Sequence, residues 1–397
     1  MSRKDYTTMQ LDMEDVVLRN RQEEEEEITL EFELQQKEHL CPACGAATSR
    51  VHDYHNRTIR DLDLRGKRTT LHYRRRRYHC PECGKKFAEK CSFAGRYQRF
   101  THRVAVKTVD LLRRRSSLKA VAEDTGISLS GVNRVLNALA VPRPEALPEA
   151  ISFDEFKGNL GGERFQCIVT DPLNHRVLDI LPKRTVETIQ DYLRSFPNRH
   201  EVKYVVLDMN RGFRDVARAF FPNAKIIIDR FHVVRFCTQA MDDVRKSVQK
   251  QLPADQRRYF KRSRRLLLAH RDKLTREDRA AVDVMLRFSD RLMQAYALKE
   301  AFYDFTAAPD KTEADRRLDF WLEACDRLQL PEFMDCRRML RNWRDYILNA
   351  FDIRLSNGFT EGCNNAIKTL KRASFGGQNF SRFRKRILLS FSLHPNI

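Results

Sequence analysis

The stretch AISFDEF, residues 150–156, places Asp154 inside an apolar run with the length of a buried strand. Two more short apolar runs follow at RFQCIVTD (164–171) and RVLDILP (176–182), and a helical pattern then extends from about 186 to 196. Three consecutive short strands separated by turn residues are typical of an antiparallel meander.

The pattern then alternates between strand and helix. A fourth strand, VKYVVLD (202–208), ends in Asp208, and a helix from about 212 to 221 leads to a fifth strand, AKIIID (224–229). A long helix begins with RFHVVRF (230–236). The order β-β-β-α-β-α-β predicts an α/β core of the ribonuclease H-like type.

Three acidic residues of this core are positioned to bind a metal ion together. The first and fourth strands are neighbours in such a sheet, so Asp154 and Asp208 are expected side by side, where two like charges need a cation. Glu361, on a late helix, is the expected third ligand of two divalent ions of the kind that support phosphodiester cleavage. Glu155 or Asp229 could replace one of the three.

The stretch FTEGCNNAIKTLKR (359–372) puts Glu361 at the start of a basic, amide-rich helix. Helical spacing brings four polar residues to roughly the same face, where they either hold a DNA strand or hold the carboxylate itself: Asn364, Asn365, Lys368 and Arg372.

Four cysteines recur in two matching motifs, CPACG (41–45) and CPECG (80–84). Two such turns predict one structural zinc site with four thiolate ligands: Cys41, Cys44, Cys80 and Cys83. The alternating segment between them, 58–80, predicts a β-hairpin and therefore a zinc ribbon. His52 and His55 are alternative ligands, disfavoured because four cysteines are available.

A helix-turn-helix follows in SLKAVAEDTGISLSGVNRVLNAL (117–139), with Gly126 at the turn. The second helix, near 128–139, would enter the major groove, and four residues are candidate base readers: Ser128, Ser130, Asn133 and Arg134. A pair of short helices also occurs in proteins that bind no DNA, so this motif depends on its context.

The composition supplies that context. The chain has 397 residues, a formal net charge of +20 and a pI near 9.7, which indicate several domains and a polyanionic partner such as DNA, RNA or an acidic membrane. No apolar run is long enough to span a bilayer, and the N-terminal residues lack the apolar stretch of a signal peptide. We therefore expect a cytoplasmic, nucleoid-associated protein and no membrane partner.

The interval from about 241 to 345 has helical periodicity and few glycines, which predicts an all-helical insertion in the core. The expected fold class is a multidomain α+β protein. Its expected parts are an N-terminal segment (1–37), a zinc ribbon (38–98), a helix-turn-helix (99–141), a linker (142–149), the first part of the core (150–240), the insertion (241–345) and core-closing C-terminal helices (346–397).

Four motifs in order resemble one known family: FDEF (153–156), VVLDMNRGF (205–213), FPNAKIIIDRFHVVR (221–235) and LSNGFTEGCNNAIKTLKRASFGGQNF (355–380). The chain resembles transposases of bacterial insertion sequences, the ISL-three group. The resemblance implies an Asp-Asp-Glu triad at Asp154, Asp208 and Glu361. It also implies that Asp229 and His232 form an Asp-x-x-His element that orders the active site or the flanking DNA; alternatively, His232 simply pairs with Asp229 at a helix start.

The expected function is therefore a DNA transposase that binds the terminal inverted repeats of its element and uses two Mg2+ or Mn2+ ions for strand cleavage and transfer. At least a homodimer is expected, because two element ends must meet. Three alternatives remain: a DNA-binding regulator with a silent core, a two-metal nuclease without strand transfer, and a recombinase that forms a covalent link through Tyr54, Tyr97 or Tyr204.

Overall fold

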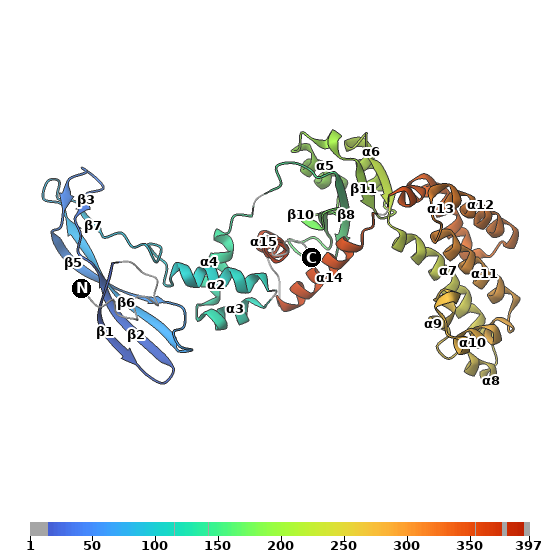
Figure 1. Ribbon diagram of the computed structural model, residues 1–397, viewed down its shortest axis with the longest axis horizontal. Coiled ribbons are helices and arrows are strands. Elements are labelled where there is room, and N and C mark those ends of the chain that lie inside the picture. The colour runs from blue at the N-terminus through green and yellow to red at the C-terminus, as the bar shows by residue number, and fades with distance from the viewer. Residues whose placement is uncertain (1–14, 115, 142, 354, 375–378, 393–397) are drawn as a thin grey trace. The chain divides into compact units, whose positions relative to one another are not determined.

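The computed structural model describes residues 15–392 except residues 115, 142, 354 and 375–378. The chain divides into two compact units (Figure 1): unit 1 comprises Met1–Val141 and Thr369–Ile397, and unit 2 comprises Pro142–Lys368. Residues 375–378, which belong to the last family motif, and residue 142 of the expected linker lie outside the described residues.

Unit 1 begins with a five-stranded sheet in the order β1-β2-β6-β5, with β7 paired to β6. The strands of this unit are β1 (Val16–Glu23), β2 (Glu27–Leu34), β3 (His39–Leu40), β4 (Ala47–Thr48), β5 (Val51–Arg60), β6 (Arg68–His79) and β7 (Lys86–Ala88). The antiparallel β5–β6 pair is the hairpin expected between the cysteine motifs. The β1–β2 hairpin, which joins the sheet by parallel pairing of β2 with β6, was not anticipated.

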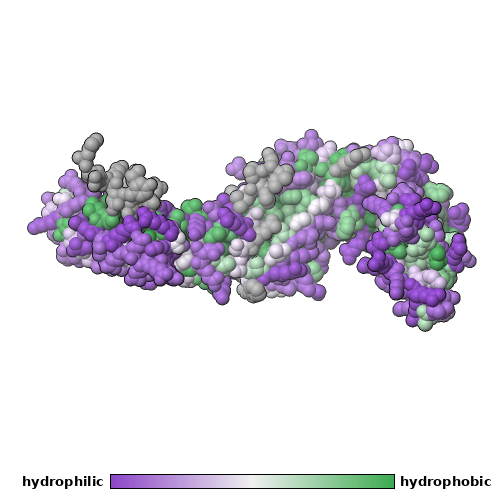
Figure 2. Space-filling view, turned by 60° about the horizontal axis from the view of Figure 1, so that its bottom comes forward, coloured by the Kyte–Doolittle hydropathy of each residue, from purple (hydrophilic) through white to green (hydrophobic). Residues whose placement is uncertain are grey.

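Alternate residues of these strands form a small apolar core that includes Leu30, Ile59 and Tyr73. The other face of the sheet is polar, and the face of this unit visible in Figure 2 is mainly hydrophilic. Each face therefore follows the two-residue period of its strands.

Three helices form the helix-turn-helix of unit 1: α2 (His102–Arg113), α3 (Leu118–Thr125) and α4 (Leu129–Ala138). Ser117 and Ser128 cap α3 and α4 by accepting backbone N–H groups, as expected for helix starts. Gly126 ends α3 with a φ of 66°, a left-handed conformation that glycine adopts without steric cost.

The last helix, α15 (Phe380–Phe391), also packs in unit 1, because Leu389 lies in the apolar core of the helix-turn-helix. Arg382 and Lys385 donate to the side chain and backbone of Asn137, at 3.0 and 2.5 Å. The sequence analysis expected residues 346–397 to close the core, whereas α15 packs on the helix-turn-helix.

Unit 2 contains the second five-stranded sheet, in the order β10-β9-β8-β11-β12. The strands are β8 (Ala150–Phe156), β9 (Gln166–Asp171), β10 (Arg176–Leu181), β11 (Tyr204–Leu207) and β12 (Lys225–Ile228). The first three pair antiparallel, and β11 lies parallel to both β8 and β12. This strand order and direction confirm the ribonuclease H-like core.

The two faces of this sheet have different coverings. Ile151 and Phe153 of β8 point into the core shared with α5 (Val186–Arg194) and α6 (Arg211–Phe220). The alternate residues, among them Asp154, therefore lie on the opposite face. That face is occupied by α14 (Gly358–Ala373), whose Asn364 and Thr360 hydrogen-bond to β8 and β9.

A helical region separates β12 from α14, as the insertion prediction required. Its elements are α7 (Arg230–Gln251), α8 (Ala254–Arg257), η2 (Arg258–Phe260), α9 (Ser263–Leu268), η3 (Arg271–Lys273), α10 (Arg276–Leu286), α11 (Asp290–Thr306), α12 (Lys311–Leu328) and α13 (Pro331–Asp352); the short η1 (Arg199–Glu201) precedes β11. The apolar core of the sheet continues into this region without a break. In the described part of the chain, no helix combines the length and apolar character needed to cross a bilayer.

Candidate active site and zinc centre

The parallel pairing of β8 with β11 places two aspartates next to each other. Phe153 pairs with Leu207, so Asp154 and Asp208 are the next residues on adjacent strands. Asp154 is 7% exposed. Burial, reinforced by the nearby charge of Asp208, raises the pKa of Asp154 to about 7.

The pKa values of the other two candidate carboxyls are raised as well. Burial and the neighbouring charge of Asp229 raise the pKa of Asp208 to about 7. The pKa of Glu361, in the first turn of α14, is also raised, mainly by burial and then by Asp229. The three residues of the expected triad therefore share one electrostatic environment, in which ionisation is costly without a cation.

Buried side-chain hydrogen bonds fix α14 on the sheet. Thr170 of β9 meets Thr360 with an oxygen–oxygen distance of 2.7 Å, and Asn364 Nδ2 donates to Asp154 Oδ2 at 2.7 Å. Because Glu361 lies between Thr360 and Asn364, these contacts hold the turn of α14 that carries it against the sheet.

His232, in the first turn of α7, lies between two of the acids. Its Nε2 is 3.0 Å from Asp208 Oδ1 and 3.3 Å from Glu361 Oε1, at ion-pair distance but without hydrogen-bond alignment. Asp229 immediately precedes this helix, and one ligand atom each of Asp229, His232 and Glu361 lie within 4.8 Å of one another. The Asp-x-x-His element is thus part of one cluster with Asp208 and Glu361, which we call the acidic cluster.

Several oxygen atoms in the cluster lack a donor. Asp208 Oδ1, Asp229 Oδ2 and Asn364 Oδ1 are buried without a hydrogen-bond partner among the described residues. Buried acceptors of this kind are normally satisfied, and carboxylate and amide oxygens are the ligands that hard divalent cations prefer. The residues present therefore fit a divalent cation.

The alternative acids have other surroundings. Glu155 follows Asp154 on β8, so its side chain points to the other side of the strand, where it pairs with Arg184. Asp229 Oδ1 accepts the backbone N–H of Asn357 at 3.1 Å. Asp229 is inside the cluster and Glu155 is beside it.

Asn357 is a residue of the site that the sequence analysis did not single out. It is fully buried, its Oδ1 accepts a hydrogen bond from Ser152 Oγ at 2.6 Å, and its side chain is close enough to Asp208 to lower the pKa of that carboxyl against the effect of burial. An asparagine just before a helix is a common capping residue, so its position in the sequence gave no sign of a contact with the sheet.

The four cysteines of unit 1 converge. The Sγ atoms of Cys41 and Cys83 are 3.6 Å apart, those of Cys44 and Cys80 are 3.5 Å apart, and all four lie within 4.8 Å of one another. No histidine belongs to this cluster in the described part of the chain.

The two cysteine motifs have the same local geometry. Gly45 and Gly84 adopt φ values of 76° and 70°, and each donates its N–H to the carbonyl of the first cysteine of its motif. The backbone N–H of Cys44 is the main cause that lowers the pKa of the Cys41 thiol to about 6. Four thiols on two such turns fit a structural zinc ion.

The candidate DNA readers of α4 are in part used structurally. Ser128 Oγ caps the helix and contacts Ser130 Oγ at 2.9 Å, and Asn133 donates to the carbonyl of Leu129. Ser128, Ser130 and Arg134 are exposed. Their exposure leaves these three side chains accessible to a bound duplex.

The basic residues of α14 are separate from the buried contacts. Asn365 and Lys368 are exposed and contact each other, with Nζ 3.4 Å from Oδ1. Arg372 is exposed in the last turn of the helix. Of the amides in this stretch, Asn364 holds the Asp154 carboxylate, whereas Asn365 is on the surface.

Comparisons with known protein families match the core, the zinc ribbon and the helix-turn-helix of this chain. Residues 151–387 match the ISL3-type DDE family described as "Transposase". Residues 37–83 match "zinc-finger of transposase IS204/IS1001/IS1096/IS1165", and residues 89–140 match "Helix-turn-helix domain of transposase family ISL3".

Two curated relatives are informative. The chain is 31% identical over 361 residues to the transposase for insertion sequence element IS1001 of Bordetella parapertussis, covering 89% of this chain and 88% of that protein. It is 26% identical over 239 residues to the transposase for IS1557 of Mycobacterium tuberculosis, covering 54% and 53% of the two chains. The first family match spans more than half of the sequence, and so the chain belongs to the ISL3 family of DDE transposases.

Proposed function

We propose that this chain binds the terminal inverted repeats of an insertion sequence and catalyses metal-dependent strand cleavage and strand transfer there. The observation that supports the proposal is the adjacent position of Asp154 and Asp208 on neighbouring strands, with His232 between Asp208 and Glu361, beside buried oxygen atoms that lack donors. Membership of the family is consistent with this chemistry.

In this proposal, Asp154, Asp208 and Glu361 hold the metal ions. Two Mg2+ or Mn2+ ions would stabilise the attacking and leaving oxygens of a phosphodiester. Asn364 keeps Asp154 Oδ2 directed at the cluster, and His232 keeps Asp208 and Glu361 at a fixed separation. These two side chains act as positioning residues.

The reaction has two steps with different nucleophiles. Water first attacks the phosphorus at the element end and breaks the bond to the 3'-oxygen, which leaves a 3'-hydroxyl and a 5'-phosphate. That hydroxyl then attacks a phosphodiester of the target and releases a new 3'-hydroxyl. Neither step uses a covalent link to the protein, and the tyrosines considered above lie outside the carboxylate cluster: Tyr54 and Tyr97 in unit 1, and Tyr204 at the start of β11.

DNA contacts in this proposal come from both units. Ser128, Ser130, Asn133 and Arg134 of α4 read the element end in the major groove, and Asn365, Lys368 and Arg372 of α14 contact the DNA backbone. One zinc ion keeps the ribbon folded. At least two copies act together in the cytoplasm, on the nucleoid, because both ends of an element are processed in one complex.

The test uses purified, zinc-loaded full-length protein, duplex DNA that carries an element end, and Mg2+ or Mn2+. Cleaved and joined strands on a denaturing gel are the expected products. A shifted complex without cleavage would identify a DNA-binding regulator, and cleavage without joined products would identify a nuclease. A product that stays attached to protein after denaturation would identify a covalent recombinase.

A further inference from the structure

A turn at residues 95–99, between β7 and α2, is held rigidly against the sheet of unit 1. Arg57 of β5 donates from Nη2 to the backbone carbonyls of Gly95 at 3.0 Å and Gln98 at 2.7 Å. The side chain of Gln98 in turn accepts the N–H of Gly95 at 3.2 Å. This ordered turn nevertheless presents Tyr97 with 78% of its surface exposed.

A groove of about 730 Å3 lies between this turn and strands β5 and β6. Its lining contains one carboxylate, that of Glu27, and five arginines: Arg57, Arg60, Arg68, Arg96 and Arg99. Within the described part of the chain, Arg68, Arg96 and Arg99 have no carboxylate at ion-pair distance. We call this the turn groove. Arg60 is paired with Asp63, but the charges of Arg68, Arg96 and Arg99 are not neutralised by any carboxylate that the structure describes, which favours an anionic ligand.

The turn groove ends at the helix-turn-helix. Gly126, the residue between α3 and α4, lines it, and a Cβ atom at this glycine would lie 2.4 Å from Nε of Arg60. The start of the expected recognition helix is therefore packed directly against the sheet edge. A duplex bound by α4 has the turn groove next to it.

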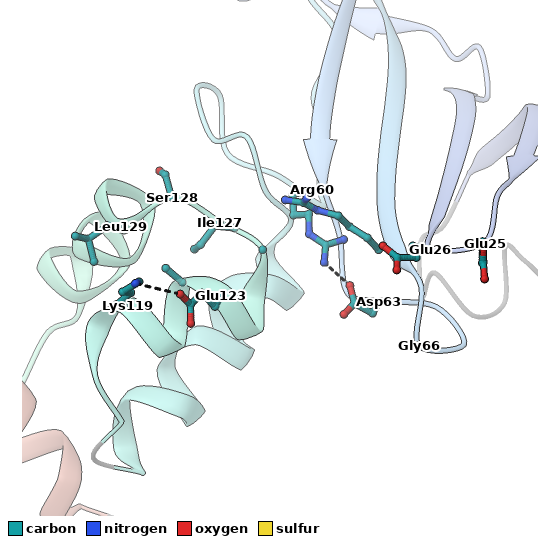
Figure 3. Close-up of a pocket in the computed structure, with 13 residues that line it drawn as sticks. Glu25, Glu26, Arg60, Asp63, Gly66, Lys119, Glu123, Ile127, Ser128 and Leu129 are labelled. Atoms are coloured by element: carbon teal, nitrogen blue, oxygen red, sulfur yellow. Dashed lines mark hydrogen bonds and ion pairs between the residues drawn. The ribbon is translucent and has the colours of Figure 1, made fainter. Parts of the chain in front are cut away.

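A second groove, of about 820 Å3, is lined by Arg60 together with residues of α3 and the start of α4 (Figure 3). It shares Arg60, Arg68 and Gly126 with the turn groove. Its cations Arg60 and Lys119 are paired with Asp63 and Glu123, and Glu25 and Glu26 add further negative charge. The second groove thus has four carboxylates and three cations, Arg68 among them, whereas the turn groove has one carboxylate and five arginines.

We propose that the turn groove binds the phosphodiester backbone of the duplex that continues beyond the segment read by α4. Arg68, Arg96 and Arg99 contact phosphates, and Tyr97 packs on the sugar edge at the tip of the turn. The proposal rests on the proposed binding of element ends. It adds a backbone contact that fixes the register of α4 on the DNA without itself reading bases.

The test measures the affinity of the full-length, zinc-loaded protein for duplex DNA bearing the element end over a range of salt concentrations. The groove variant is the triple substitution Arg68→Ala, Arg96→Ala and Arg99→Ala. Each lost phosphate contact reduces the slope of log K against log salt by about 0.9, so the slope should fall by nearly 3. Tyr97→Ala should weaken binding with the slope unchanged, because the tyrosine carries no charge.

The control variant removes the same charge at the other end of the sheet, through Arg50→Ala, Lys85→Ala and Lys86→Ala, all at exposed residues beside the cysteine motifs. The ten residues of β5 separate Arg50 from Arg60 by roughly 30 Å. The control should keep the wild-type slope. Equal losses in the two triple variants would mean a diffuse electrostatic attraction and would overturn the proposal.

Footprinting and Arg134→Ala separate this proposal from the function on which it rests. The groove variant should lose protection only in the DNA flanking the α4 site, whereas Arg134→Ala should weaken binding at that site. If the wild type does not bind the element end, the proposed function fails. If the wild type binds and the groove variant keeps the same slope and footprint, only the turn groove proposal fails.

Discussion

Asp208→Asn should stabilise the zinc-loaded protein at pH 8 in buffer without magnesium or manganese. The pKa of Asp208 is raised from the ordinary 3.8 to about 7 by burial and by Asp229. The folded state therefore keeps a proton that the unfolded chain releases above pH 4. Stability from this group is present at low pH and is lost as the pH rises through about 7.

The size of the effect follows from the same pKa. The difference between 3.8 and about 7 corresponds to roughly 4 kcal/mol for an ionised carboxyl, at about 1.4 kcal/mol per tenfold change in proton affinity. Water entry and relaxation reduce this, so we expect about 2–3 kcal/mol at pH 8. For a domain of 150–250 residues, this raises Tm by roughly 4–12 °C. At pH 5 the folded carboxyl keeps its proton but the unfolded one has already lost it, so about a third of the effect, roughly 1 kcal/mol, should remain.

Thermal unfolding of both proteins at pH 5 and pH 8 measures the effect. Glu155→Gln is the matched control, because Glu155 is adjacent on β8 but pairs with Arg184 outside the cluster. Mg2+ should raise the Tm of the wild type at pH 8 more than that of Asp208→Asn. A Tm change of equal size at both pH values, or a lower Tm at pH 8, would refute the inference that burial and Asp229 raise the pKa of Asp208.

Three further results are expected. Cys41→Ser should abolish stoichiometric zinc binding and DNA binding, as measured by metal analysis and gel shift, while the separate unfolding transition of unit 2 persists; full zinc content would contradict the assignment. Asn364→Ala should slow strand cleavage by roughly 10- to 100-fold with little change in DNA affinity, because Asp154 loses its buried donor; an unchanged rate would exclude the positioning role. Gly126→Ala should destabilise unit 1 by about 1–2 kcal/mol in denaturant unfolding, because the residue has a φ of 66° and its Cβ would press on Arg60; unchanged stability would show that the turn adapts.

The local parts of this structure were predictable from the sequence. The CPxCG motifs determine their own turn geometry within five residues, so Cys41 and Cys80 could be assigned before any fold was known. The aspartate in AISFDEF and the aspartate after YVVL followed from strand periodicity and from the neighbouring positions of the first and fourth strands. Such features depend on few residues and on regular geometry.

The contacts missed from the sequence depend on long-range docking. Asn357 bonds to Ser152 across 205 positions, and no local pattern distinguishes this contact from an ordinary helix cap. The sequence also did not reveal the β1–β2 hairpin, whose turn carries the exposed acids Glu24, Glu25 and Glu26. The amphipathic pattern of α15 shows that it packs on something, and only the fold identifies the helix-turn-helix as its partner.

The central claim is that three acids, far apart in the sequence, act as one catalytic unit. The most direct measurement is the single-turnover rate of strand cleavage with Mg2+, together with DNA affinity. It is made on the variants Asp154→Asn, Asp208→Asn and Glu361→Gln. We expect each rate to fall by roughly a thousandfold or more at near wild-type affinity, while Glu155→Gln remains active. Wild-type cleavage by any one of the three variants would contradict the claim.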